Sequence, residues 1–111
     1  MTKQKFEKSI FIINNKMILK NPKDYTLTGF QKSLTKHKKY DAILKNKNTQ
    51  KQKRIPFGDS RYPQYMDTVP LQLYKSRNHY DKLRRKRYRA RHWQDPKNKY
   101  SSGWFSWHYL W

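Results

Sequence analysis

The chain has 111 residues, with 27 lysines and arginines against 7 aspartates and glutamates, and a formal net charge of +20 at pH 7. This length allows one domain, and an apolar content of 34% predicts a small core. The absence of cysteine excludes disulfides and thiolate metal sites. Such an excess of positive charge predicts a polyanionic partner, most commonly nucleic acid, with an anionic membrane surface or an acidic protein surface as alternatives.

Charged and aromatic residues are distributed unevenly along the chain. Residues 1–53 carry all their positive charge as lysine, whereas residues 54–111 hold all eight arginines and thirteen of the aromatic residues. Arginine forks onto phosphates and stacks on rings, while lysine is a hydrated point charge. We therefore predict a Lys-rich arm and linker over 1–53, partly extended, and an Arg- and aromatic-rich module over 54–111. The expected fold class is small α+β or mainly α, with a compact aromatic-cored C-terminal module and an extended basic N-terminal arm.

Within the predicted arm, Ser9–Leu19 contains two short β-prone runs around Asn14–Asn15, which indicates a hairpin. Leu27–Leu44 has partial helical spacing of its apolar residues. Lys45–Arg54 has no apolar residue and is the predicted linker. The apolar run Ile10–Ile13 is too short for a signal sequence or a membrane span, so we expect no transmembrane segment and a protein that is intracellular or packed inside a particle assembled in a cell.

The predicted module begins with a short strand over Arg54–Gly58. An ordered loop held by aromatic packing follows over Asp59–Pro70, and then a turn or short helix over Leu71–Asn78. A last short helix starts at Ser101 or Ser102 and runs to Trp111, with aromatic residues around nearly its whole circumference. With few aliphatic residues in the module, its aromatic residues are expected to form the core rather than to stack on bases. We expect Trp107, Leu110 and Trp111 to be buried against Phe57, or against Tyr62 and Tyr65.

Between these segments lies a strongly basic helix. Seven of the twelve residues from Asp81 to His92 are Lys or Arg, and Asp81 is placed to cap the start of the helix. Arginines interrupt the stripe that would otherwise be apolar, so this helix is poorly suited to burial against a neutral core. The alternative, internal pairing, fails because seven acids cannot neutralise so many cations. The predicted contacts to phosphates or to an acidic partner are Lys82, Arg84, Arg85, Lys86, Arg87, Arg89 and Arg91.

The arginines of this helix are not expected to behave alike. Arg87 and Arg91 share an arc with Tyr80 and Leu83, so they are the ones expected to pack inside the module if any do. Arg85 and Arg89 lie off that arc and are the expected free phosphate contacts. Contacts to phosphate predict binding with little sequence preference.

No set of residues predicts catalysis. The histidines match no zinc spacing, Gly58 stands outside any Gly-rich phosphate loop, and the carboxylates form no catalytic pair. Asp59 and Asp67 are candidates for a nuclease-type metal pair, but turn caps and salt bridges to arginines explain them better. We therefore expect a protein that is not an enzyme, with no cofactor, no metal and no small-molecule substrate.

Three motifs of the module resemble a known family. They are F-G-x-x-x-Y-x-x-Y-x-D at Phe57–Asp67, R-Y-x-x-R-H at Arg87–His92, and the aromatic segment Ser102–Trp111 after an Asp-Pro. Together they are similar to small basic proteins of large and giant double-stranded DNA viruses. The resemblance covers about half the chain. It implies a viral origin and a place in the virion, and it implies no reaction.

Two functions follow as expectations. The first is a non-enzymatic basic structural protein of a large DNA virus particle, a minor capsid or virion component. Its partners would be packaged nucleic acid, the acidic inner surface of capsid proteins, or both. Such a protein would be found in the virion, and inside the host cell during assembly. The alternative is a ribosomal protein, including an organellar one, embedded in RNA, where short aromatic cores and basic extensions also occur.

Overall fold

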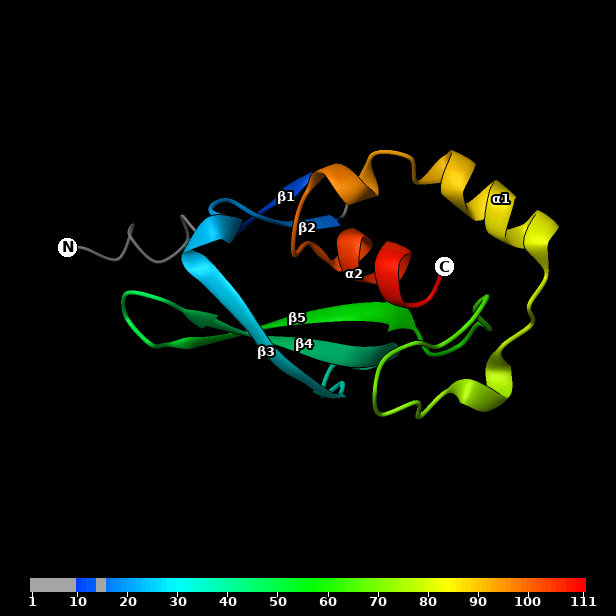
Figure 1. Cartoon of the computed structure of the whole chain (residues 1–111), viewed down its shortest axis with the longest axis horizontal. Coiled ribbons are helices and arrows are strands. Elements are labelled where there is room, and N and C mark those ends of the chain that lie inside the picture. Colours follow the sequence, from blue (N-terminus) through cyan, green and yellow to red (C-terminus); the bar gives the residue numbers. More distant parts are fainter. Residues whose placement is uncertain (1–9, 14–15) are drawn as a thin grey trace.

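Three antiparallel strands occupy the centre of the computed structural model, which describes residues 10–13 and 16–111, with side chains from residue 18 onward. The strands are β3 (Tyr25–Lys32), β4 (Lys38–Asn46) and β5 (Gln52–Asp59), in the order β3-β4-β5. A separate antiparallel hairpin joins β1 (Ile10–Ile13) to β2 (Lys16–Leu19). The helices are α1 (Lys82–Arg91) and α2 (Ser102–Tyr109), with short 3-10 turns η2 (Pro22–Asp24), η3 (Lys75–Arg77) and η4 (Asp95–Lys97). Figure 1 shows α2 lying over the sheet and α1 extending beyond one end of it.

Alternation in β4 sets the buried face of the sheet. Tyr40, Ala42 and Leu44 are all fully buried, as expected for every second residue of a strand. Opposite them in β5, Phe57 pairs with Tyr40 and Ile55 pairs with Ala42. The rings of Tyr40 and Phe57 lie 5.8 Å apart, so the pairing of β4 and β5 builds one continuous layer of the core.

Helix α2 closes this layer from above. The Phe105 ring stacks on Phe57 at 5.3 Å and meets Phe30 of β3 edge-on at 6.1 Å. Leu110 is buried beside Gly58, which has φ +77°, and a Cβ there would lie 2.8 Å from Leu110 Cδ1. Only glycine fits both the left-handed backbone and the close approach.

The expected fold class, a compact C-terminal module with an extended basic N-terminal arm, is wrong. Strands β3 and β4 come from the predicted arm, yet Tyr25, Tyr40 and Leu44 lie in the same core as Phe57 and Phe105. The structure is a small α+β domain in which a single sheet joins the two parts, and residues 53 and 54, where the boundary was expected, both lie inside β5. The mainly helical alternative fails with it. Residues 1–9 of the predicted arm lie outside the described residues.

Two segment predictions fail for the same reason. Leu27–Leu44, with its partial helical spacing, is the β3–β4 hairpin, and Lys45–Arg54, the predicted linker, is the end of β4, a turn and the start of β5. Lys36 and Lys38, which interrupt the apolar pattern of the first segment, are exposed, whereas Lys39 beside them is buried. The hairpin prediction over Ser9–Leu19 is confirmed for the paired strands, while its turn at Asn14–Asn15 lies outside the described residues.

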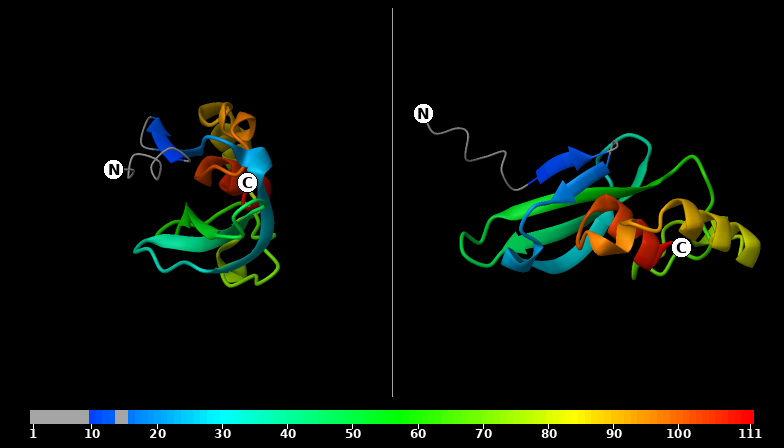
Figure 2. Two further views of the ribbon diagram at one scale, coloured as in Figure 1. Left: turned by 90° about the vertical axis from the view of Figure 1, so that its left-hand side faces the viewer. Right: turned by 90° about the horizontal axis from the view of Figure 1, so that it is seen from above.

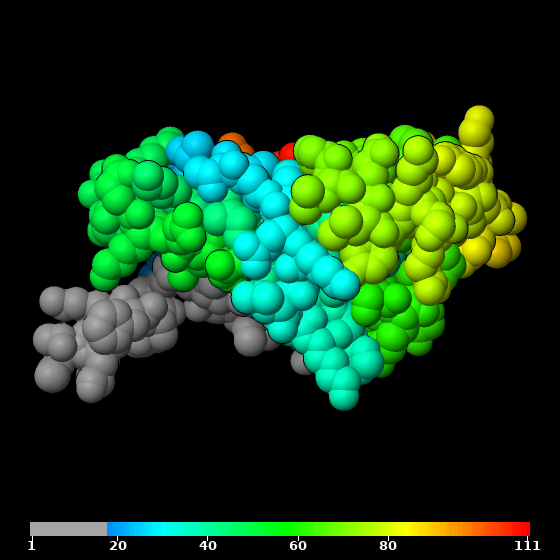
Figure 3. All heavy atoms as spheres, turned by 90° about the horizontal axis from the view of Figure 1, so that it is seen from below, coloured from blue at the N-terminus to red at the C-terminus, as the bar shows by residue number. Residues whose placement is uncertain are grey.

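The molecule is elongated, and different elements lie at the two ends of its long axis. The domain measures 50 × 26 × 23 Å, with α1 at one end of the long axis and the β4–β5 turn at the other (Figure 2). The loop over residues 60–80 gathers at the α1 end (Figure 3). Neither α1 nor α2 has the length and apolar character needed to cross a bilayer, and the described part of the chain contains no other α-helix.

Candidate nucleic-acid interface

Helix α1 starts where the sequence predicts. The Asp81 side chain accepts hydrogen bonds from the backbone nitrogens of Leu83 (3.0 Å) and Arg84 (3.1 Å), and these bonds lower the pKa of the Asp81 carboxyl. Arg89 and Arg91 lie in the last turn, where positive charge is favoured by the helix dipole. No α1 residue is completely buried, and only Arg85, Tyr88 and Arg89 are half-buried, so this helix is held at the surface of the domain along one side.

Tyr88 lies on the side of α1 that faces the domain. Its ring stacks between Trp111, at 4.3 Å and 4° between planes, and His92, at 4.2 Å. Burial of the Tyr88 hydroxyl raises its pKa. The stack ties α1 to the segment that follows α2, and it fixes which residues of the helix face the domain.

Arg85 and Arg89 flank Tyr88 and hold the helix down. Arg85 Nε donates to the backbone oxygen of Trp111 at 2.7 Å, and Arg89 Nη2 donates to the same oxygen at 3.1 Å. Their guanidinium groups also lie over aromatic rings, Arg85 over Tyr65 at 4.8 Å and Arg89 over Trp107 at 4.9 Å. These two were the expected free contacts, so the structure reverses the predicted assignment within the helix. The sequence could not show this, because the rings and the acceptor come from other elements.

The other five cations of α1 face solvent. Lys82, Arg84, Lys86, Arg87 and Arg91 are all exposed, including Arg87 and Arg91, for which packing inside the module was the alternative. Within the described residues no ion pair joins any of them to an aspartate. The predicted set of seven is therefore divided into five exposed cations and two docking arginines.

The aspartates are occupied by local structure. Asp41 accepts from Ser33 Oγ (2.6 Å) and from the backbone nitrogen of Leu34. Asp67 accepts from Tyr40 and from two backbone nitrogens. Both carboxylates therefore accept hydrogen bonds from nearby turns and strands, and neither pairs with a cation of α1.

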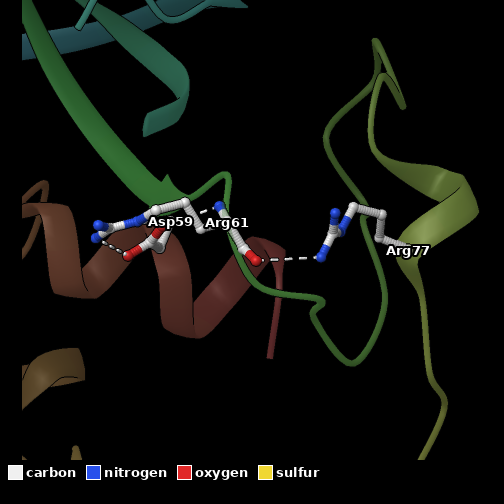
Figure 4. Close-up of polar contacts among 3 residues, drawn as sticks. All are labelled: Asp59, Arg61 and Arg77. Atoms are coloured by element: carbon white, nitrogen blue, oxygen red, sulfur yellow. Dashed lines mark hydrogen bonds and ion pairs between the residues drawn. The ribbon is translucent and has the colours of Figure 1, made fainter. Parts of the chain in front are cut away.

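Asp59 makes the expected salt bridge to an arginine. It pairs with Arg61 at 2.8 Å, and this hydrogen-bonded pair lowers the pKa of Asp59 to about 2. Figure 4 shows the pair at the end of β5, with Arg77 Nη2 donating to the backbone oxygen of Arg61 at 3.3 Å. Asp67 takes the other expected role, that of a turn cap, because its carboxylate accepts from the backbone nitrogen of Val69 two residues later, and it also accepts from the Tyr40 hydroxyl. Among residues 10–13 and 16–111 no group of three His, Asp or Glu lies close enough to hold a metal ion.

Sequence reasoning missed Lys39 and Trp93. Lys39, within a run that resembles solvated charge, is only 2% exposed and donates to Gln64 Oε1 at 2.6 Å. Trp93 is 56% exposed just after α1, with Lys97 Nζ 4.2 Å from its ring centroid, although the aromatic residues were expected in the core. We also expected Trp107, Leu110 and Trp111 to be buried. Leu110 is buried, but Trp107 and Trp111 are half-buried, and Tyr62, one of their expected partners, is exposed.

A pocket of about 380 Å³ lies between α1, α2 and the end of β5. Phe57, Leu110 and Trp111 are among its apolar lining residues. Its cations Lys38, Lys39 and Arg91 are accompanied by the acids Asp59 and Asp95, so it has mixed charge. Comparison of the chain with protein-family models, curated proteins and solved structures gives no match.

Proposed function

We propose that this chain is a non-enzymatic structural protein that binds the phosphate backbone of nucleic acid through α1. The observation that supports this is the set of exposed α1 cations, Lys82, Arg84, Lys86, Arg87 and Arg91, with no ion pair to an acid within the described residues. Phosphate is the anion that such an uncompensated array fits best, because binding releases condensed counterions. The similarity of Phe57–Asp67, Arg87–His92 and Ser102–Trp111 to small viral proteins adds the proposal that the chain belongs to a large DNA virus particle.

A second candidate partner is an acidic protein surface, such as the inner face of a capsid. Tyr80 and Leu83, which flank the cap residue Asp81, are 57% and 55% exposed. Exposed apolar side chains beside cations are more useful against a protein than against phosphates. This candidate keeps α1 as the binding element and changes only the partner.

The test is a salt titration of binding to duplex DNA and to single-stranded RNA, followed by fluorescence anisotropy. Five phosphate contacts predict a slope of log affinity against log salt of about −4.5 for duplex DNA, with little preference between sequences. Arg87→Gln should reduce the magnitude of the slope by about one. The matched control is Lys51→Gln, an exposed residue in the turn between β4 and β5 at the other end of the domain, which removes the same charge.

The expected result is a changed slope for Arg87→Gln and the parent slope for Lys51→Gln. Equal effects of the two variants would show that net charge, and not α1, determines binding. No binding to either nucleic acid at about 0.15 M salt would contradict the proposal and leave the acidic protein surface as the partner.

A further inference from the structure

One side of α1 carries a hollow lined only by cations. Lys82, Arg85, Lys86 and Arg89 line this shallow, open hollow of about 300 Å³. Their spacing of i, i+3, i+4 and i+7 places them on one strip of a helix with 3.6 residues per turn. Unlike the pocket beside β5, this hollow has no acidic lining residue, so its charge is of one sign.

Two of the four cations are held in place. Arg85 and Arg89 each lie over an aromatic ring and each donate one hydrogen bond to the backbone oxygen of Trp111. A guanidinium has several N–H donors, so most of their donor capacity is unused by these contacts. Fixed arginine forks lose little conformational entropy when they bind a further acceptor.

Arg89 also has an unsatisfied hydrogen-bond donor. Its Nε is buried and makes no hydrogen bond. Leaving such a donor without an acceptor is unfavourable, and the oxygen of an anion would satisfy it. In addition, burial and the positive charge of Arg85 lower the pKa of Arg89, so a negative charge between the two arginines would relieve their repulsion.

We propose that this hollow is a seat for a single phosphate group of a nucleic-acid backbone. Arg85 and Arg89 form its fixed base, and the exposed Lys82 and Lys86 close over the bound group. Planar arginine forks match the tetrahedral oxygens of phosphate, and a lysine adds a mobile point charge. The inference rests on the proposed function and adds to it a defined position at which one phosphate is held more tightly than the rest.

Lys86→Gln and Arg87→Gln provide the test, because they remove the same charge from adjacent, exposed residues of α1 and only Lys86 lines the hollow. The first probe is inorganic phosphate, measured by the ³¹P line width and by calorimetry at low ionic strength. We expect Lys86→Gln to weaken phosphate binding about fivefold or more, and Arg87→Gln to change it less than about twofold. A short single-stranded oligonucleotide should then displace the bound phosphate.

Arg89→Lys tests the base of the seat. The substitution keeps the charge but removes the fork and the Nε donor, so phosphate affinity should fall about tenfold. Since Arg89 also holds α1 in place, the exchange protection of the α1 amides is measured in the same variant. If Arg89→Lys loosens the helix, Lys86→Gln decides the question, because the Lys86 side chain is exposed and its loss leaves the docking contacts intact.

Equal losses in Lys86→Gln and Arg87→Gln would overturn the seat, and continued oligonucleotide binding in that case would leave the proposed function standing. Phosphate binding that depends on Lys86 but is not displaced by oligonucleotide would overturn the nucleic-acid assignment of the seat. Vesicles of phosphatidylcholine with phosphatidylglycerol form the last arm. Displacement of phosphate by these vesicles alone would assign the site to lipid headgroups and contradict the proposal.

Discussion

The buried hydroxyl of Tyr40 joins β4 to the loop over residues 60–80. It donates to Asp67 Oδ2 at 2.5 Å and accepts from the backbone nitrogen of Leu73 at 2.8 Å. Asp67 in turn accepts from the backbone nitrogens of Val69 and Tyr74. Both side chains are almost completely buried, so the loop keeps its shape through contacts that water cannot replace.

Tyr40→Phe should therefore destabilise the domain by about 1–3 kcal/mol, because it leaves the Leu73 N–H without its acceptor and removes one of the three donors to the Asp67 carboxylate. Urea unfolding followed by tryptophan fluorescence measures the change. Tyr62→Phe is the matched control, since Tyr62 is 60% exposed, and it should stay within about 0.5 kcal/mol of the parent. Equal stability of the two variants would show that the Tyr40 hydroxyl is not a structural link.

At this scale the sequence predicts local contacts and misses distant ones. Asp81 caps α1, and Ser101 Oγ caps α2 by accepting from the backbone nitrogen of Trp104 at 3.0 Å. The sequence predicts a cap at Asp81 and one at Ser101 or Ser102. The roles of Arg85 and Lys39 depend on Trp111 and Gln64, which lie 26 and 25 residues away. Neither partner is encoded in the local pattern of charge and hydrophobicity.

The β4–β5 hairpin shows why an element can be mistaken for a linker. The Asn46 side chain accepts from the backbone nitrogens of Asn48 and Thr49, and Gln50 takes a positive φ of 66°, which turns the chain back on itself. The strand ends beside this turn are paired in the antiparallel ladder, with Lys45 opposite Gln52 and Leu44 opposite Lys53. Backbone pairing does not require apolar side chains, so a run of polar residues conceals it.

Helix α1 is attached to the rest of the domain through a few side chains on one side of the helix. With no buried side chain, it relies on the Tyr88 ring between Trp111 and His92 and on the two arginines beside it. We expect its amides to be less protected from hydrogen exchange than those of β4, which lies in the centre of the sheet. Tyr88→Ala should remove most of the α1 protection and leave β4 protected.

Ala90→Gly provides the comparison for this experiment, because Ala90 is exposed on the same helix and makes none of the docking contacts. That change lowers helix propensity by about 1 kcal/mol without removing the aromatic stack. Greater loss of α1 protection in Ala90→Gly than in Tyr88→Ala would mean that intrinsic propensity, and not docking, maintains the helix. Parallel loss in α1 and β4 would mean that the helix unfolds only with the whole domain.

Over the whole molecule, charge and core compete. The net charge of +20 disfavours a compact state, while the aromatic core from both parts of the chain favours it. Both effects act on Lys39, because it is a cation whose side chain is buried in the folded domain. Burial, reinforced by the positive charge of Arg77, lowers the pKa of Lys39 to about 8 from 10.5.

This shift predicts that stability rises with pH above about 8. Between pH 8 and 10.5 the unfolded chain binds a proton at Lys39 that the folded chain has released, so the free energy of unfolding increases in that window. The shift corresponds to a gain of up to about 3 kcal/mol. Tyr40 has the opposite effect above pH 10, where it lowers the free energy of unfolding. Burial and Asp67 raise its pKa, so the folded chain keeps a proton that the unfolded chain loses.

Urea unfolding at pH 7, 8, 9 and 10 measures this pH dependence. The free energy of unfolding should rise with pH in the parent and in Lys45→Met, an exposed position on the same strand, but not in Lys39→Met. The same rise in both variants would mean that general relief of charge repulsion, and not the buried Lys39, controls the pH dependence.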